Sequence, residues 1–321
     1  MPSEFELIAR YFERKAKGAV LGVGDDAALV RTSADCDLAI STDMLLEGRH
    51  FLPGAEPRAL GHKTLAVNLS DMAAMGAKPR WATLAIALPS DDEAWLEAFA
   101  RGLFALAERH GVELIGGDTT RGPLTLAVTI LGEVPRGKAL LRSGARAGDD
   151  VWVSGELGGG ALGLAYLQGR AKLSADDARD ACVRLEEPEA RVALGERLIG
   201  IAHSAIDVSD GFAADLGHIL ERSGLGATVN YDALPRPAAF ARLKNRHLEQ
   251  HCVLSGGDDY ELVFTAAPAA RATLAKLGGE LGLRLSRVGT IEAGSASLRV
   301  LDHEGEPIAY AGGFDHFRRD A

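Results

Sequence analysis

The spacing of apolar residues changes several times along the chain between helical and strand periods. The first segment has helical spacing, and Ser3 with Glu6 forms a capping box ahead of it, so the chain is predicted to open with a helix. Residues 81–88 are apolar almost throughout, which is typical of a well-buried strand. Further on, the first half is predicted to hold helices over 57–76 and 91–110 and strands over 38–41, 81–88, 113–115 and 124–134.

A polar, glycine-rich and basic stretch over residues 135–150 interrupts this pattern and is predicted to be a linker. It separates two predicted domains, 1–137 and 148–321. The second is predicted to hold helices over 161–168, 174–187, 189–202 and 212–223 and strands over 151–154, 227–231, 260–265, 285–291 and 298–301. Both halves therefore mix the two periods, which predicts an α/β protein of the α+β type.

Composition narrows the classes of partner. The chain has 321 residues, of which 47% are hydrophobic and 25% charged, so each half can bury a core. The net charge of −10 argues against non-specific binding of nucleic acid. The longest apolar run falls far short of the ~20 residues that cross a membrane, and no signal peptide is expected. The three cysteines have neither metal-ligand nor redox spacing, which favours a reducing cytoplasm.

Six acidic clusters lie next to Gly, Ser or Thr and are spread over nearly the whole chain. Two carboxylates about 4 Å apart repel by roughly 4 kcal/mol at an effective dielectric constant near 20, so clusters that meet in the fold need a cation between them. Mg²⁺ prefers oxygen ligands and is usually bound together with phosphates. The clusters are GDDAA (24–28), STDMLLEG (41–48), NLSDMAAMGA (68–77), GGDTTRG (116–122), DVSDG (207–211) and SGGDDYEL (255–262).

In the first half, two of these clusters have the residue types of a magnesium site. Residues 41–43 offer two hydroxyls and a carboxylate at the end of a predicted strand, although such triplets also cap helices. Asp71 lies in an otherwise apolar helical stretch, where a carboxylate is rarely buried without a partner. Asn68 is three residues earlier and shares its face of the helix.

Two further clusters suit phosphate or metal binding. Gly117 precedes Asp118 after a buried strand, and glycine lets a phosphate approach the backbone. Asp207 and Asp210 flank Ser209 just before a predicted helix, whose N-terminal N–H groups attract anions. The simpler interpretation of the second cluster is a helix cap.

Two glycine patterns match nucleotide-binding motifs, but the surrounding sequence does not fit such a site. Residues 158–163 match G-x-G-x-x-G and residues 22–27 match its G-x-G-x-x-A form. A dinucleotide site needs an acidic residue at the end of the next strand, whereas a polar helix follows the first match. A P-loop sequence does not occur in the chain. ATP, if it binds, must therefore be held in another way.

Taken together and in order, the acidic clusters resemble those of the thiamine-monophosphate kinase family, within the superfamily related to aminoimidazole ribonucleotide synthetase. The resemblance also rests on RSGARAGD (142–149) and runs from Glu4 to about Phe317. It implies a two-domain fold in which the strands of the N-terminal domain form a barrel across a homodimer, with active sites near the domain junction. It also implies an enzyme that uses ATP to convert thiamine monophosphate into thiamine diphosphate and ADP.

The resemblance further implies a role for individual residues. Several Mg²⁺ ions would be bound by Asp26, Ser41, Thr42, Asp43, Asp71, Asp118, Asp207 and Asp210. ATP would be contacted by Gly117, Asp118, Arg142 and Ser209. Thiamine monophosphate would be contacted by His50, Asp258 and Phe314. The family more often has Glu at the position of Asp258 and Tyr or Trp at the position of Phe314.

The chemistry agrees with these roles. Both substrates are phosphates, so transfer requires positioning and neutralisation of charge more than covalent catalysis. The attacking phosphate oxygen is already ionised, and no general base is expected. Two alternatives remain: another ATP-dependent enzyme of the superfamily, such as an amide- or formyl-activating ligase or a maturation factor, and a non-catalytic module that binds metal or nucleotide.

Overall fold

A computed structural model describes residues 4–313, which fold into two compact units. One unit comprises the chain up to Met72 together with Ala77–Lys138, and the other comprises Ala73–Gly76 and the chain from Ala139. No helix among the described residues is both long enough and apolar enough to cross a membrane.

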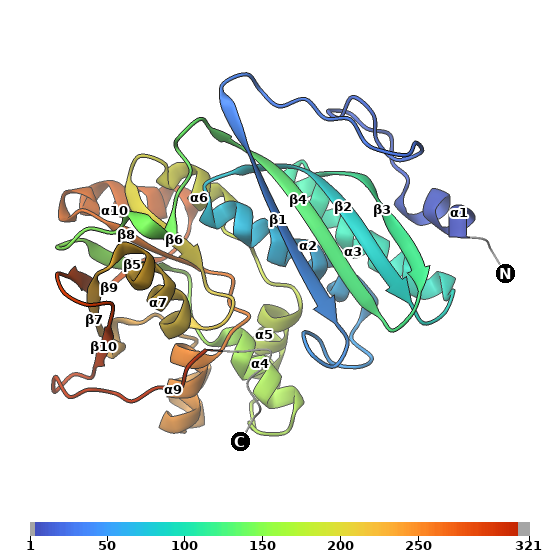
Figure 1. Ribbon diagram of the computed structural model, residues 1–321. Helices are drawn as coiled ribbons and strands as arrows, with labels where there is room; N and C mark the ends of the chain where they lie inside the picture. Colours follow the sequence, from blue (N-terminus) through green and yellow to red (C-terminus); the bar gives the residue numbers. More distant parts are fainter. Residues whose placement is uncertain (1–3, 314–321) are drawn as a thin grey trace. The chain divides into compact units, whose positions relative to one another are not determined.

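The first unit is a four-stranded sheet with helices on one face (Figure 1). The strand order is β1-β4-β2-β3, and only the β2–β3 pair is parallel. The elements are α1 (Glu4–Leu7), a π-helical turn (Ile8–Phe12), β1 (Cys36–Leu46), α2 (Pro57–Ala74), β2 (Lys78–Leu88), α3 (Glu93–His110), β3 (Glu113–Arg121) and β4 (Thr125–Pro135). The predicted opening helix is thus confirmed from Glu4 onward, while Ser3 lies outside the described residues.

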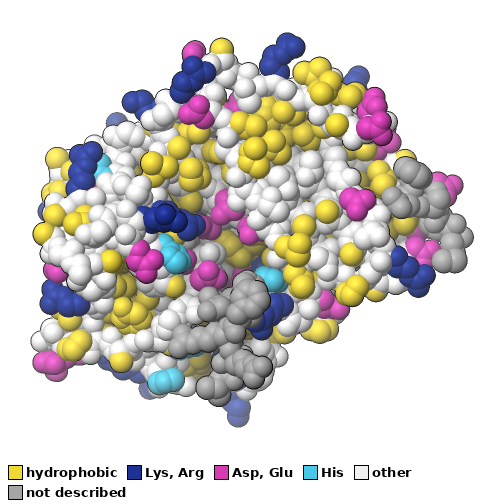
Figure 2. All heavy atoms as spheres, viewed as in Figure 1, with side chains coloured by type: hydrophobic (Ala, Val, Ile, Leu, Met, Phe, Trp, Pro, Cys, Tyr) yellow, Lys and Arg dark blue, Asp and Glu magenta, His cyan; other side chains and the backbone are white. Residues whose placement is uncertain are grey.

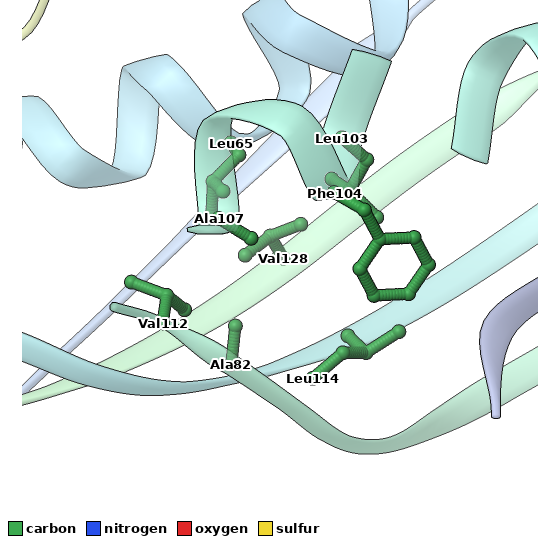
Figure 3. Close-up of a pocket in the computed structure, with 8 residues that line it drawn as sticks. All are labelled: Leu65, Ala82, Leu103, Phe104, Ala107, Val112, Leu114 and Val128. Atoms are coloured by element: carbon green, nitrogen blue, oxygen red, sulfur yellow. The ribbon is translucent and has the colours of Figure 1, made fainter. Parts of the chain in front are cut away.

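The helices α2 and α3 pack tightly because each has a glycine where they meet. A methyl group added at Gly61 would come within 2.0 Å of the carbonyl oxygen of Phe99, and one added at Gly102 within 1.8 Å of that of Arg58. The space left between α3 and the sheet is an apolar gap of about 10 Å³, lined by side chains such as Leu65, Phe104 and Val128 (Figure 3). This gap is a packing feature of the core and is too small for a substrate.

Strand β1 is longer than predicted, which changes how its polar residues are presented. Ser41, Thr42 and Asp43 lie inside the strand and not at its end. Successive side chains of a strand point to opposite faces, so Ser41 and Asp43 share one face and Thr42 lies on the other. Strand β3 is also longer than predicted and includes Gly117 and Asp118.

The outer face of this sheet is rich in exposed apolar side chains. Along β1, Ile40 is 61% and Met44 53% exposed, and Leu38 and Leu46 are also exposed. Figure 2 shows hydrophobic side chains gathered over the strands of this sheet. A contiguous exposed apolar surface of this kind often marks an interaction site, more often than the rest of a protein surface does.

The second unit is a six-stranded mixed sheet in the order β10-β7-β9-β5-β8-β6. Its central strands β5 and β8 are buried at every position, because helices cover both faces. The strands are β5 (Asp150–Ser154), β6 (Ala202–Asp207), β7 (Gly226–Asn230), β8 (Leu262–Ala266), β9 (Leu285–Glu292) and β10 (Leu298–Leu301). The helices are α4 (Gly159–Leu167), α5 (Ala175–Glu186), α6 (Val192–Leu198), α7 (Phe212–Ser223), α8 (Ala239–Leu243), α9 (Arg246–Ser255) and α10 (Arg271–Leu281).

The predicted elements of this unit are largely confirmed, but the helices α8, α9 and α10 were not predicted, and one further error affects the site. The helix predicted over residues 189–202 ends at Leu198, and the edge strand β6 follows it. The sequence pattern did not predict β6, although this strand carries Asp207 at its end. Its short run, Ala202–Asp207, mixes polar and apolar positions, and its last four residues are all buried, polar Ser204 and Asp207 included.

Candidate metal and nucleotide site

In the first unit, a hydroxyl and a carboxylate from different elements meet at β1. The Ser41 hydroxyl donates a hydrogen bond to a carboxylate oxygen of Asp71 on α2, over 2.5 Å. The sequence suggested that the half-buried Asp71 has a partner, and Ser41 of the neighbouring strand is one. Together the two side chains offer the hard oxygen ligands that Mg²⁺ prefers.

Asn68 fixes the strand beside this pair. Its side-chain carbonyl accepts a hydrogen bond from the backbone N–H of Asp43 at 3.2 Å, and its amide group donates to the Thr64 carbonyl. The Asn68 side chain is only 1% exposed, so its carbonyl oxygen and its amide nitrogen both form their hydrogen bonds inside the protein. The sequence placed Asn68 on the face of Asp71 but did not assign this positioning role.

The structure separates the Thr42 side chain from this group. Its hydroxyl is hydrogen-bonded to that of Thr129 on β4, at 2.8 Å, on the outer face of the sheet. Ser41 and Asp43 pair in register with Ile130 and Val128, which are buried on the helical side. The Thr42 hydroxyl therefore lies on the opposite face of the sheet from the side chains of Ser41 and Asp43.

Asp118 lies apart from these residues in the same chain. It is on β3, and β1 and β3 form opposite edges of the sheet, about 14 Å apart at three strand spacings. Asp118 also pairs in register with Ala85, on the outer face and not on the helical side. Gly117 before it has φ of 153°, and a side chain there would come within 1.9 Å of the Leu84 carbonyl oxygen.

Asp26 and His50 lie on connecting segments of the first unit. Asp26 is exposed in a turn in which its N–H donates to the Asp25 carboxylate. Ring nitrogen Nδ1 of His50 accepts a hydrogen bond from the Leu46 N–H at 3.0 Å. The neutral imidazole therefore carries its proton on Nε2, a donor suited to a phosphate oxygen.

In the second unit, the loop between β6 and α7 is held by a buried acid that follows it. One carboxylate oxygen of Asp215 accepts the N–H groups of Ser209, Asp210 and Gly211, each at 3.1 Å. Asp215 is only 2% exposed. Burial, and then the negative charges of Asp207 and Asp210, raise the pKa of Asp215 to about 8. The acids Asp207 and Asp210 therefore lie close enough to Asp215 to affect its ionisation.

The adjoining loop, residues 256–260, is bonded to the first one. The N–H of Asp258 donates to the Ser209 carbonyl and the N–H of Tyr260 to the Val208 carbonyl, at 3.0 and 2.9 Å. Asp258 and Tyr260 have positive φ angles of 66° and 51°, which are unfavourable for residues other than glycine. Such strain persists only where the surroundings enforce it, and it is concentrated at functional sites.

Two neighbouring acids brace this strained loop from within. The Asp259 carboxylate accepts the N–H groups of Gly158 and Gly160 at the start of α4, at 2.7 and 3.3 Å. Glu261 is 2% exposed; it accepts a hydrogen bond from Ser154 and forms a two-pronged ion pair with Arg191. The glycine pattern at 158–163 therefore serves to dock α4 on this loop.

Arg142 is an exposed residue that is anchored through its backbone. It begins a short 3₁₀ turn (Arg142–Gly144), and its carbonyl accepts a hydrogen bond from Ser223 on α7. Gly144 lies so close to β6 that a side chain there would come within 1.7 Å of the His203 carbonyl oxygen. The predicted contact Phe314 lies outside the described residues.

No group of three or more His, Cys, Asp or Glu side chains within residues 4–313 is close enough to hold a metal ion by itself. The acids occur as smaller groups within each unit. Such groups fit Mg²⁺, which is usually bound by one or two carboxylates together with water and the phosphates of a substrate.

Two family models match the two halves of the chain. The model for the N-terminal domain of AIR synthase related protein matches residues 24–134, and the model for its C-terminal domain matches residues 146–300. The thiamine-monophosphate kinase of Salmonella typhimurium is 47% identical to this chain, over 98% of both sequences.

Solved structures agree with these matches. The crystal structure of thiamine-monophosphate kinase from Stenotrophomonas maltophilia K279a has a TM-score of 0.84 and 49% identity, and covers 94% of this chain and 95% of that one. The structure "AaThiL complexed with AMPPCP and TMP" has a TM-score of 0.77 at 31% identity, covering 98% and 97%. The chain belongs to the thiamine-monophosphate kinase family, and both of its halves belong to the AIR synthase related proteins.

Proposed function

We propose that this protein transfers the γ-phosphoryl group of ATP to the phosphate of thiamine monophosphate, giving thiamine diphosphate and ADP. The observation that carries the proposal is 47% identity to a thiamine-monophosphate kinase over 98% of both chains. A relative of the same fold was solved with the ATP analogue AMPPCP and TMP. In this reaction a bond from the γ-phosphorus to an acceptor phosphate oxygen forms while its bond to ADP breaks.

The oxygen-rich groups described above are the proposed ligands of Mg²⁺. The side chains of Asp26, Ser41, Asp43, Asp71, Asp118, Asp207 and Asp210, with the backbone carbonyl of Thr42, would hold the ions. Mg²⁺ would supply neutralisation of the phosphate charges that otherwise repel one another. Asn68 keeps Asp43 beside the Ser41–Asp71 pair.

The remaining residues bind and orient the two substrates. The exposed guanidinium of Arg142 offers a two-pronged contact to the nucleotide phosphates. Gly117, Asp118 and Ser209 complete the proposed ATP contacts. His50 donates from Nε2 to the phosphate of thiamine monophosphate, and Asp258 and Phe314 attract its thiazolium cation. The acceptor oxygen is already ionised at neutral pH, so no residue needs to remove a proton.

We further propose that the protein acts as a homodimer joined through the outer face of the N-terminal sheet. Exposed Ile40 and Met44 lie on this face, and Asp118 points to it from the edge strand opposite β1. Because Asp118 cannot reach Ser41 or Asp71 in its own chain, a second copy would supply it. A barrel of strands shared by two copies satisfies both observations.

The proposed location is the cytoplasm, where ATP is available. The cysteines Cys36, Cys182 and Cys252 are all free thiols, which suits a reducing compartment.

The reaction is tested by incubating the protein with ATP and Mg²⁺, with and without thiamine monophosphate, and by measuring ADP and thiamine diphosphate together. We expect Mg²⁺-dependent thiamine diphosphate in a one-to-one ratio with ADP. ADP without thiamine diphosphate, or no product at all, would contradict the proposed acceptor.

A further inference from the structure

The buried acid Asp215 occupies a position that a bound anion could otherwise fill. Three successive backbone N–H groups, those of Ser209, Asp210 and Gly211, converge on one of its oxygens. Convergent N–H groups ahead of a helix are a recurrent binding site for phosphate and carboxylate. Here the accepting oxygen is part of the protein, contributed by the first turn of the helix that follows.

This arrangement differs from an ordinary helix cap elsewhere in the protein. At α3, the N-cap residue Asp92 precedes the helix and accepts the N–H groups of Ala94 and Trp95 within it. At α7, the acid lies inside the helix and reaches back to N–H groups of the preceding loop. Asp92 is exposed, whereas Asp215 is 2% exposed, so the internal acid is sealed from water.

Gly211 makes this reversed arrangement possible. Its φ of 118° is favourable only for glycine, and an added methyl group would come within 2.8 Å of the Ser255 backbone. The loop is therefore fixed on two sides, by the packing of Gly211 and by the three hydrogen bonds to Asp215. Asp207 and Asp210 are both close enough to Asp215 to interact with its charge.

We propose that Asp215 is a positioning residue that dedicates the 207–211 loop to cations by occupying its anion site. With the N–H groups engaged, the loop cannot bind a phosphate oxygen through its backbone. Its contribution to phosphate binding then passes through ions held by Asp207 and Asp210 and through the side chain of Ser209. This inference rests on the proposed function, because it takes those two residues as Mg²⁺ ligands.

The test compares Asp215→Ala, Asp215→Asn and the control Asp92→Ala in the full chain. Affinity is measured by titrating Mn²⁺, as a substitute for Mg²⁺, into the protein saturated with ADP, whose phosphates complete the coordination of the ions, and stability as Tm. We expect Asp215→Ala to weaken Mn²⁺ binding by about 10- to 100-fold, as loss of a group that orients metal ligands does. Asp215→Asn keeps an acceptor oxygen and should lose less. Asp92→Ala should lower Tm by about 2–4 °C and leave Mn²⁺ affinity unchanged.

A second measurement detects the anion site that the substitution opens. Inorganic phosphate should raise the Tm of Asp215→Ala by more than it raises that of the unmodified protein. Wild-type Mn²⁺ affinity in Asp215→Ala, or no Mn²⁺ binding by the unmodified protein, would overturn the proposal. Since the titration requires no turnover, Mn²⁺ binding without formation of thiamine diphosphate would instead count against the proposed reaction alone.

Discussion

The two units hold their functional residues by different means. In the first unit the polar side chains extend from regular elements, such as Ser41 on β1 and Asp71 on α2, and the pleat of the strand decides where each one points. In the second unit they lie on two loops, 207–211 and 256–260. These loops are hydrogen-bonded to each other and are braced by buried acids.

The difference shows which residues each unit depends on. A side chain on a regular element is positioned mainly by that element, so a substitution there can remove chemistry and leave the fold intact. A strained loop requires support, and Asp215, Asp259 and Glu261 provide it from behind. We therefore expect activity and stability to be separable in the first unit and linked in the second.

The largest expected effect tests this separation in the first unit. Asp71→Asn keeps an oxygen that can accept the Ser41 hydrogen bond but removes the charge that would bind Mg²⁺. We expect turnover to fall by at least about 100-fold with almost no change in Tm. A matched control is Asp37→Asn, an exposed acid on the same strand, which should retain full activity. Activity of Asp71→Asn within about tenfold of wild type would refute a metal role for Asp71.

The next prediction tests the bracing of the second unit. Arg191→Ala leaves the buried carboxylate of Glu261 without its ion-pair partner. Removing one partner of a buried pair costs about 3–5 kcal/mol, so both stability and activity should drop. The control is Arg197→Ala, which breaks an exposed pair with Glu280 and should cost less than about 1 kcal/mol. Urea unfolding measures both values, and similar losses would show that the brace is unimportant.

A smaller effect is expected where the N-terminal sheet is open. Ile40→Asp places a charge on the outer face of β1, where Ile40 is 61% exposed. If two copies pack there, the dissociation constant of the dimer should rise at least about tenfold, because the charge would be buried without a partner. Val183→Asp, on the exposed surface of α5, is the control and should change nothing. Sedimentation of both variants decides the matter, and an unaffected dimer would place its interface elsewhere.

The smallest effect concerns acid stability in the second unit. The hydrogen bond from Arg271 lowers the pKa of buried Asp150 below its ordinary value of 3.8, and the charges of Arg271 and Arg287 add to this, against the effect of burial. The ionised form therefore stabilises the fold above about pH 4. This contribution disappears as the pH falls through the lowered pKa.

Arg271→Ala should accordingly reduce the free energy of unfolding only slightly at pH 7, since Arg271 is half exposed. The difference between variant and wild type should shrink below about pH 4. Urea unfolding at both pH values measures it, and a difference that grows on acidification would contradict the assignment.

Local patterns predicted most of the elements and the residue types of the site. The helix α7 was predicted at its observed bounds, because Phe212 and Leu216 repeat along one buried face. The strand β6 was missed, since its buried positions include the polar residues Ser204 and Asp207 and so show no hydrophobic alternation. Single residues could be identified as acids in turns, but the pairing of Ser41 with Asp71 depends on a tertiary contact between β1 and α2.

The role of the buried acids could not be predicted in the same way. Asp215 and Asp259 belong to stretches that look like any polar helix start or acidic turn. Their function depends on which N–H groups the folded backbone turns toward them, such as those of Gly158 and Gly211. The placement of Asp118 likewise follows from strand order, which is a property of the whole sheet.

The position of Asp118 at the edge opposite β1 has a genetic consequence. If each site combines Asp71 of one copy with Asp118 of the other, two inactive alleles can complement each other. A mixed dimer of an Asp71→Asn chain and an Asp118→Asn chain would contain one doubly defective site and one fully intact site. Cells that carry both alleles should then recover activity that neither allele provides alone.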